Sequence, residues 1–174
     1  MEAYYGSLYE DLVNDAVQRE AVISRLQYQA THDNLTGLPD RKGLSIRFED
    51  AQHDERNEGS GSLLFIDLDG FGEVNKRLDY KTGDRVLVAA AEAIKSLNDS
   101  VRGTDTVARL GGDEFVVLMP GANEQIAADR AELICKLIAN EVQTEATGIP
   151  IGASIGVVGF DRYSSLEEIR HQAD

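Results

Sequence analysis

The amino-acid sequence predicts an α/β domain in which helices pack on a mostly antiparallel sheet, preceded by an N-terminal connector helix. Two observations predict it: long stretches with apolar residues at helical spacing, and short β-branched runs bounded by glycine, proline or acidic residues. In chain order these give β-α-α-β-β-α-β, the order of an α/β sandwich. The 174 residues suffice for one domain with a substantial core.

The N-terminal helix is predicted over residues 8–31, which contain no glycine or proline and repeat apolar residues at helical spacing. The heptad pattern is imperfect, so this helix is either a packing helix or a connector to an upstream domain. We therefore divide the chain into an N-terminal helix or linker, residues 1–31, and a folded domain, residues 32–174.

Within the domain, Gly37 and Pro39 break the first helix, and Asp40 is placed to cap the next one. LLFIDLD reads as a buried strand that ends in acids, and a short helix and a longer one from about Gly83 follow it. The remaining elements are a hairpin around a glycine pair, a helix, a strand and a final helix, predicted over residues 104–120, 123–142, 149–160 and from 164 or 165 onward.

The composition is that of a soluble protein with little affinity for polyanions. The formal charge is −14, from 17 basic and 31 acidic residues, and without a basic excess we expect no binding to nucleic acid or anionic lipid. No apolar run approaches the roughly 20 residues that span a bilayer, so we expect no direct membrane contact. The single cysteine, Cys135, cannot form an internal disulfide, which fits a reducing cytoplasm.

Two pairs of acidic residues stand where strands are expected to end. Asp67 and Asp69 are two positions apart, so their side chains leave the same face, and Asp113 and Glu114 follow the glycine pair of the hairpin. If the hairpin pairs beside the first strand, the two acidic pairs meet around a hard cation such as Mg²⁺. Acidic turns also serve solubility alone, so the spacing leaves both interpretations open.

Several exact strings resemble one protein family. RLGGDEF, residues 109–115, resembles the signature of GGDEF domains, the diguanylate cyclases that condense two GTP into cyclic di-GMP. HDNLTGLPDR is similar to the entry motif of that family, FIDLDGF to its metal-binding strand end and ASIGV to its last core strand. The resemblance covers residues 30–174 and implies a βααββαβ palm-like sandwich like that of the class III nucleotidyl cyclases.

The resemblance also implies roles for single residues. Asp67 and Asp113 would bind Mg²⁺, with Mn²⁺ as the alternative, through their carboxylates, and Leu68 through its backbone carbonyl. Glu114 would bind metal or assist deprotonation of the attacking 3′-hydroxyl, and the roles of Asp113 and Glu114 are not separated. Neighbouring strand residues face opposite ways, so only local turn geometry lets both acids reach one site.

By the same resemblance, Asn75 and Asp84 stand at the guanine-reading positions, while Gly111 and Gly112 would let the backbone approach the nucleotide closely. Asp84 can accept from N1–H and the exocyclic amine of guanine, and the amide of Asn75 can donate and accept. The alternatives are that Asn75 lies on a solvated helix face and that Asp84 caps the helix after Gly83.

RGTD, residues 102–105, fits the product-inhibition motif of the family. Arg102 would hold a phosphate or guanine of cyclic di-GMP, with Asp105 assisting. The alternative is a local salt bridge between these two residues, which their spacing also allows.

The chain departs from the family where phosphates are held. Gly72 stands where a lysine is common, Asn75-Lys76 replaces the usual Asn-Asp, and Asp79-Tyr80 replaces the usual Gly-His. The sequence ends at RHQAD, where family members continue into a helix with phosphate-binding Lys and Arg and then a final strand. We therefore expect the metal and base contacts to be retained and phosphate neutralisation to be weaker.

The resemblance implies a diguanylate cyclase in which each subunit of a homodimer holds one GTP with Mg²⁺, and the N-terminal helix is a candidate for setting that dimer. The alternative is a weakly active or inactive regulatory module that binds GTP or cyclic di-GMP next to an EAL phosphodiesterase domain. In either case we expect an upstream sensor, a downstream EAL domain, or both, in the parent protein. The intact acids favour the enzyme. A polymerase palm shares the carboxylate chemistry, but the chain lacks its size and basic surface.

Overall fold

The computed structural model describes residues 2–99, 104–142 and 148–173. Helices α1 (Glu2–Gln29) and α2 (Arg41–Gln52) and the short turn η1 (Glu55–Asn57) precede the sandwich. The predicted β-α-α-β-β-α-β order is confirmed. Its elements are β1 (Gly61–Asp67), α3 (Phe71–Arg77), α4 (Tyr80–Asp99), β2 (Thr106–Gly111), β3 (Glu114–Pro120), α5 (Glu124–Glu141), β4 (Ser154–Phe160) and α6 (Leu166–Ala173).

The four strands form one antiparallel sheet in the order β2-β3-β1-β4. Strand β1 lies inside the sheet, because β3 and β4 both pair with it from Gly61 to Asp67. Its continuous apolar run suits a strand that is covered on both faces. As a result, the acid at the end of β1 lies between the ends of two neighbouring strands.

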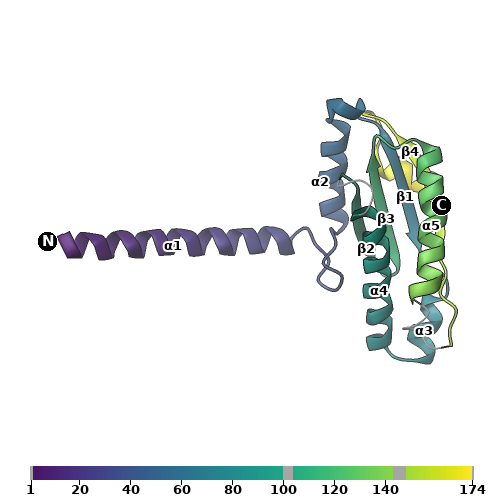
Figure 1. Ribbon diagram of the computed structural model, residues 1–174, viewed down its shortest axis with the longest axis horizontal. Helices are drawn as coiled ribbons and strands as arrows, with labels where there is room; N and C mark the ends of the chain where they lie inside the picture. The colour runs from purple at the N-terminus through teal and green to yellow at the C-terminus, as the bar shows by residue number, and fades with distance from the viewer. Residues whose placement is uncertain (1, 100–103, 143–147, 174) are drawn as a thin grey trace.

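Helices cover both faces of the sheet and define two hydrophobic cores (Figure 1). Helices α3, α4 and α5 pack on one face, and α2 and α6 on the other. Leu64 and Ile66 of β1 belong to the first core, while Leu63 belongs to the second, with Phe65 packed against it. Because side chains alternate along a strand, Asp67 faces the side of α2 and α6.

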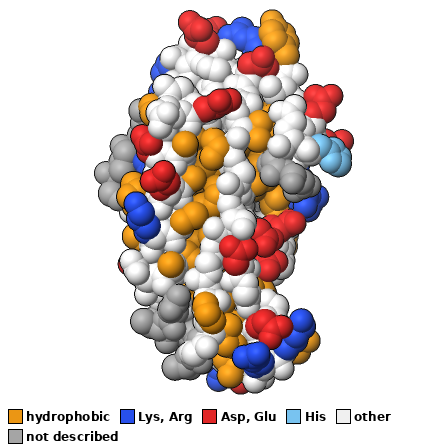
Figure 2. Space-filling view, turned by 90° about the vertical axis from the view of Figure 1, so that its right-hand side faces the viewer, with side chains coloured by type: hydrophobic (Ala, Val, Ile, Leu, Met, Phe, Trp, Pro, Cys, Tyr) orange, Lys and Arg blue, Asp and Glu red, His pale blue; other side chains and the backbone are white. Residues whose placement is uncertain are grey.

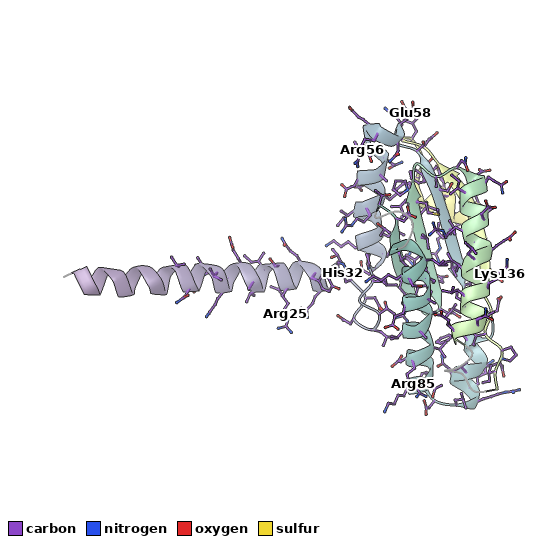
Figure 3. All side chains as sticks on the ribbon, in the orientation of Figure 1. Arg25, His32, Arg56, Glu58, Arg85 and Lys136 are labelled. Carbon is purple, nitrogen blue, oxygen red and sulfur yellow. The ribbon has the colours of Figure 1, made fainter. Side chains whose placement is uncertain are left out.

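Helix α1 projects away from the domain (Figure 1), and its side chains from residue 13 to residue 29 are exposed to solvent (Figure 3). The exposed side chains include apolar ones such as Val17, Ile23 and Leu26. A helix that exposes apolar residues along its length is suited to pairing with another helix.

The C-terminal end of α1 is fastened to the domain by an aromatic contact. The ring of Tyr28 stacks on that of His32 with centroids 3.8 Å apart, and the Tyr28 hydroxyl donates to the carbonyl of Gly37 at 3.1 Å. His32 lies at the junction of helix and domain (Figure 3). The entry loop between α1 and α2 is therefore in contact with the end of α1.

Strands β2 and β4 form the two edges of the sheet among the described residues. Most of β4 is only partly buried, and the corresponding side of the molecule shows a strip of hydrophobic side chains down its middle (Figure 2). The expectation that a further helix and strand follow residue 174 stays a prediction. None of the described helices combines the length and hydrophobicity needed to cross a membrane.

Helix α4 begins at Tyr80, earlier than the predicted start near Gly83. The carboxylate of Asp79 accepts a hydrogen bond from the backbone N–H of Thr82 at 2.6 Å and caps the helix one turn earlier. Asp84 therefore lies inside α4, and the interpretation of Asp84 as a helix cap is wrong.

Candidate active site

The end of β1 brings two of the predicted site acids together. Asp67 is the cross-strand partner of Glu114 on β3 and of Ser154 on β4. Directly opposite residues of an antiparallel pair point to the same face, with Cβ atoms about 5 Å apart. The hairpin thus pairs beside β1, as expected, and Asp67 and Glu114 meet on the face that α2 and α6 cover.

The turn between β2 and β3 carries two neighbouring acids, Asp113 and Glu114, directly after a pair of glycines. The strand register shifts between Arg109 and Gly111, and Gly111 and Gly112 have φ angles of 141° and 53°, which favour glycine. A Cβ added at either glycine would meet nothing within 4 Å, so the outer side of the turn is open. Asp113 lies in the turn and Glu114 begins β3.

Asp67 experiences the charges of the whole acidic cluster. Its pKa lies above the usual range because of partial burial and the negative charges of Asp113, Asp69 and Glu114. As the side chains stand, no three His, Cys, Asp or Glu residues within the described ranges are arranged as a metal site. A hard divalent cation prefers carboxylate oxygens and would relieve this repulsion if the side chains turned toward it.

Asp69 has a structural role at the same strand ends. The Ser154 hydroxyl donates to its two carboxylate oxygens at 3.0 and 3.1 Å. The backbones of Asp69 and Gly152 exchange hydrogen bonds of 3.0 and 3.1 Å. Asp69 therefore ties the end of β1 to the start of β4 and fixes the backbone that carries Asp67.

Glu114 has a cationic partner on α6. One guanidinium nitrogen of Arg170 donates to both carboxylate oxygens of Glu114, at 3.0 and 3.1 Å, and both side chains are only partly exposed. The pair lies at a pocket of about 300 Å³ on the face of the sheet. The other residues around this pocket include Phe65, Asp67, Leu110, Ser154 and Gly156.

Arg109 fixes the hairpin turn to the entry loop. Its guanidinium donates to the carbonyl of Gly112 at 3.1 and 2.7 Å and to the carboxylate of Asp33 at 2.8 Å. Its backbone N–H donates to Pro39 at 2.9 Å. Burial opposes ionisation of Asp33, but hydrogen bonds from Thr36 and Arg109 outweigh it and hold the pKa of Asp33 below its usual range.

Helices α3 and α4 place Asn75 against Gly83, the neighbour in sequence of the other predicted guanine-reading residue, Asp84. Gly83 packs so closely against the side chain of Asn75 that a Cβ at Gly83 would overlap the Asn75 Oδ1. Asp84 follows Gly83 and lines a pocket of about 320 Å³, at the end of the domain where Figure 3 labels Arg85. The other lining residues are Leu35, Lys81, Arg85, Val88, Ala89 and Glu92. An apolar wall beside a carboxylate suits a purine base.

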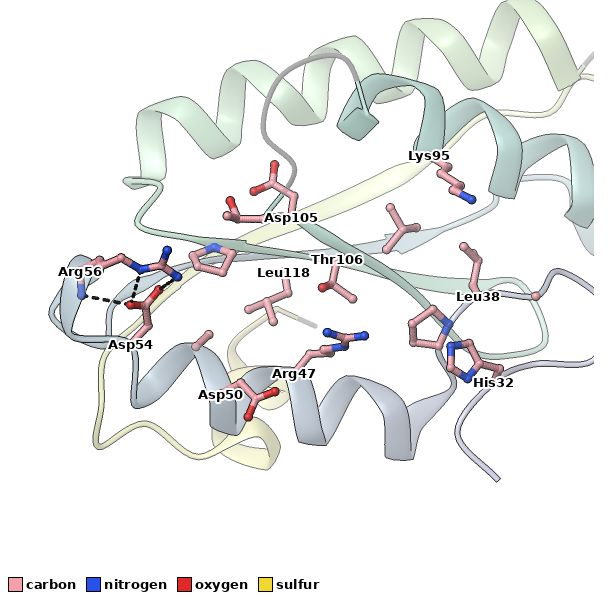
Figure 4. A pocket seen from close by; sticks show the side chains of 16 residues that line it. His32, Leu38, Arg47, Asp50, Asp54, Arg56, Lys95, Asp105, Thr106 and Leu118 are labelled. Carbon is pink, nitrogen blue, oxygen red and sulfur yellow. Dashed lines mark hydrogen bonds and ion pairs between the residues drawn. The ribbon is translucent and has the colours of Figure 1, made fainter. Parts of the chain in front are cut away.

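A larger pocket of about 590 Å³ runs along the outer edge of β2, between α2 and α4 (Figure 4). Asp105 and Thr106 line it from the β2 side, and the side chains of Arg47 on α2 and Lys95 on α4 extend toward the space between the helices (Figure 4). The other predicted product-binding residue, Arg102, lies outside the described residues. The lining combines the basic residues Arg47, Arg56 and Lys95 with the acids Asp50, Asp54 and Asp105.

The sequence motifs, the order of the strands and the acidic cluster point to one family, and comparison with known proteins decides it. The family model described as diguanylate cyclase, GGDEF domain, matches residues 30–174. The chain belongs to the GGDEF family. The match begins just after α1, so the GGDEF domain comprises the entry loop and all the elements that follow it.

Curated relatives of this GGDEF domain are longer proteins. The bifunctional diguanylate cyclase/cyclic di-GMP phosphodiesterase MucR of Pseudomonas aeruginosa is 43% identical over 144 residues, 82% of this chain and 20% of MucR. The diguanylate cyclase DgcS of Shewanella oneidensis is 34% identical over 163 residues, 89% of this chain and 52% of DgcS. The chain therefore spans between a fifth and about half of these relatives.

A solved structure supports the same fold. The crystal structure of the GGDEF domain of YfiN, or TpbB, from Pseudomonas aeruginosa has a TM-score of 0.69 and 33% identity to this chain. The match covers 80% of this chain and 87% of that one. The antiparallel sheet with helices on both faces is thus the GGDEF fold.

Three contacts of the site were not foreseen from the sequence: those of Arg109, Ser154 and Arg170. Arg109 belongs to RLGGDEF, but its partner Asp33 is 76 positions away in the entry motif. Arg170 reaches Glu114 across 56 positions and Ser154 reaches Asp69 across 85. Single-sequence patterns carry no signal for pairs this far apart. For Arg109 the sequence does give one indication, because this residue belongs to the same string, RLGGDEF, as Asp113 and Glu114.

We predict that Arg109→Gln destabilises the domain by about 2–3 kcal/mol, because Asp33 and the turn carbonyl of Gly112 lose a buried charged donor. The pKa of Asp33 is lowered in the folded chain, so its contribution to stability is present above about pH 4 and is lost as the pH falls. Urea denaturation between pH 3 and 7 should show a smaller loss at low pH for the variant than for the wild type.

The matched control is Arg56→Gln, since Arg56 pairs with Asp54 at the surface, where its side chain is 82% exposed. That variant should denature like the wild type. Equal stabilities of Arg109→Gln and Arg56→Gln would contradict the role given to Arg109.

We also predict that Asp67→Asn raises the melting temperature of the metal-free chain by about 1–3 °C at pH 7, since one repelling charge is removed. The pKa of Asp67 is raised in the folded state, so the ionised carboxylate costs stability as the pH rises above about 4. Differential scanning calorimetry in EDTA should find the gain at pH 7 and little gain below pH 4. Asp129→Asn on the exposed face of α5 serves as the control, and a lower melting temperature for Asp67→Asn would overturn the prediction.

Proposed function

We propose that this GGDEF domain is the catalytic part of a diguanylate cyclase that condenses two GTP molecules into cyclic di-GMP and two pyrophosphates. The observation that carries the proposal is the meeting of Asp67 and Glu114 at one end of the sheet, with Asp113 in the adjoining turn; burial and the nearby negative charges raise the pKa of Asp67 there. Family membership and the curated diguanylate cyclases among its relatives support it.

In each of the two steps, the 3′-hydroxyl oxygen of one GTP attacks the α-phosphate of the other. A phosphodiester bond forms, the bond from that phosphorus to the oxygen bridging the α- and β-phosphates breaks, and pyrophosphate leaves with the bonding electrons. The hydroxyl proton passes to a carboxylate of the turn, Asp113 or Glu114. Each domain holds one GTP, so two copies must face each other, and the exposed apolar residues of α1 make it our candidate for holding them together.

We assign Mg²⁺, with Mn²⁺ as the alternative, to the carboxylates of Asp67, Asp113 and Glu114 and the backbone carbonyl of Leu68. Leu68 is 2% exposed, which fixes its backbone, and among the described residues its carbonyl accepts one long hydrogen bond, of 3.4 Å, from the N–H of Phe71. An oxygen held this loosely remains free to bind a cation. A divalent cation bound there would offset the negative charge that develops on the phosphates.

We assign guanine recognition to Asn75, whose side chain packs against Gly83, and to Asp84, which lines a pocket with Leu35, Val88 and Ala89. Adenine lacks the N1–H and amine donors that a carboxylate accepts, so we expect GTP to be preferred. The open outer side of Gly111 and Gly112 leaves room for the nucleotide to approach the turn.

Phosphate binding is expected to be the weak point of the 174-residue chain. A Cβ at Gly72 would meet nothing within 4 Å, so space for a longer side chain exists and is not used. Tyr80, which stands where the family usually has a histidine, is 80% exposed to solvent. Each missing charge-assisted contact costs about 1.5–3 kcal/mol, so we expect weak GTP binding unless further parts of the parent protein supply cations.

The wider setting is also a proposal. We infer a parent protein with an upstream sensor, a downstream EAL domain, or both, located in the cytoplasm. The relative MucR carries both activities in its name, and the chain corresponds to a fifth of it.

The proposal is tested by incubating the full-length gene product and the 174-residue chain with GTP and Mg²⁺. Cyclic di-GMP and pyrophosphate should appear in a ratio of about one to two, and the rate should rise more than linearly with protein concentration. Glu114→Gln should lower the rate at least about 100-fold, as loss of a catalytic carboxylate does. Glu49→Gln, the same change on the exposed side of α2, is the control. A full-length protein that binds GTP or cyclic di-GMP without forming product would instead be a binding module.

We further propose that cyclic di-GMP binds at Arg102 and Asp105 and extends into the adjoining pocket, where Arg47 and Lys95 meet its phosphates. Arg102→Ala should raise the concentration of cyclic di-GMP needed for half-inhibition about tenfold or more, and Lys95→Ala should raise it several-fold. Lys136→Ala, on the far face of α5 (Figure 3), is the control. Undiminished inhibition of the Arg102 variant would exclude this site.

A further inference from the structure

The carboxylate of Glu114 faces two demands at once. The proposed cyclase needs it beside a divalent cation, yet in the structure one nitrogen of Arg170 engages both of its oxygens, at 3.0 and 3.1 Å. A metal ion would use those same oxygens. The acidic side chains are correspondingly not arranged as a metal site in the described part of the chain.

We propose that Arg170 is a positioning residue that acts as an internal counter-ion of the metal site: it holds Glu114 in the metal-free domain, and a divalent cation must displace it. The inference rests on the proposed function, because it takes Glu114 as a metal ligand. It goes further by giving α6 a role in whether the site is occupied.

Charge arithmetic sets the direction of the effect. A guanidinium that has given up Glu114 is still carried by α6 beside that carboxylate, so it stays within several ångströms of a cation bound there. A charge of +1 and a charge of +2 about 5–6 Å apart repel by roughly 1.5 kcal/mol even at the dielectric constant of water. Removing the charge of Arg170 should therefore strengthen metal binding about tenfold. The attraction between Arg170 and Glu114 also weakens metal binding, because the pair must separate before the cation can use the carboxylate.

The Arg170–Glu114 pair joins α6 to the sheet, so the same exchange should alter the stability of α6. Ile169 is buried in the core beneath this helix, and Leu166 is partly buried against that core. Most of the stability of a helix in a folded protein comes from such tertiary contacts. Loss of the Arg170–Glu114 pair on metal binding should let α6 open more often.

The decisive experiment is a Mn²⁺ titration of the 174-residue chain followed by electron paramagnetic resonance of the free ion. Arg170→Gln should bind Mn²⁺ about tenfold more tightly than the wild type, and Arg170→Lys, which keeps the charge, should lie close to the wild type. Arg162→Gln is the matched control: it removes the same charge from the loop before α6, where Arg162 donates to the backbone of Glu58. Thermal unfolding verifies that each variant is folded.

A second measurement follows α6 itself. Amide hydrogen exchange of residues 168–173 should quicken when Mg²⁺ is added to the wild type. In Arg170→Gln it should be fast with and without the ion. Exchange that does not respond to Mg²⁺ in the wild type would overturn the coupling to α6.

The outcomes separate this inference from the proposed function. If Glu114→Gln leaves Mn²⁺ affinity unchanged, Glu114 is not a ligand and the assignment of the metal site fails. If Glu114→Gln weakens binding while Arg170→Gln has no effect, the metal site stands and the counter-ion role is wrong. Weaker binding by Arg170→Gln would show that Arg170 instead orients Glu114 for the metal, which also overturns the proposal.

Discussion

Repulsion among the carboxylates at the end of β1 is the constraint on which the arrangement of the site depends. The sheet register cannot relieve it, because Asp67 and Glu114 are cross-strand partners in the same ladder that organises both cores. A slip of the register by one residue would move Glu114 away from Asp67 but would turn every apolar side chain of β1 to the wrong face. Hydrophobic burial along β1 thus holds together charges that repel, and the raised pKa of Asp67 reflects partial loss of hydration together with that repulsion.

The acids at this end of the sheet have different hydrogen-bonding partners. Asp69 is satisfied by the hydroxyl of Ser154, and Glu114 by the guanidinium of Arg170. Arg109 has a different role from Ser154 and Arg170. It holds the turn that carries Asp113 and Glu114, and it joins that turn to Asp33 in the entry loop. Because α1 contacts the same entry loop, a short chain of hydrogen bonds leads from the connector helix to the acidic turn. A displacement of α1 therefore has a physical route to the site.

The sequence sufficed for features that depend on local patterns. The order of elements, the buried β1 and the hairpin at the glycine pair followed from periodicity and turn residues, and the family from exact strings. The boundary at Gly83 was wrong because the cap at Asp79 was not recognised. The clamp by Arg109 and the pair of Arg170 with Glu114 could not be predicted, because each joins distant segments whose contact depends on how helices dock on the sheet. The sequence marks which acids gather but not which cations meet them.

The pairing of Arg170 with Glu114 also gives a reason to expect that metal binding and nucleotide binding depend on each other in this domain. In the proposed cyclase, the acidic end of the sheet would repel a triphosphate, and Gly72 offers no side chain to offset this, so most of the attraction would have to come from a bound cation. Under our proposal, a cation that uses Glu114 has to compete with Arg170 for it. Once displaced, the guanidinium of Arg170 would remain near a site where negative phosphates replace its carboxylate partner. The internal counter-ion that weakens metal binding in the free domain is therefore placed to favour the metal–nucleotide complex over the metal alone.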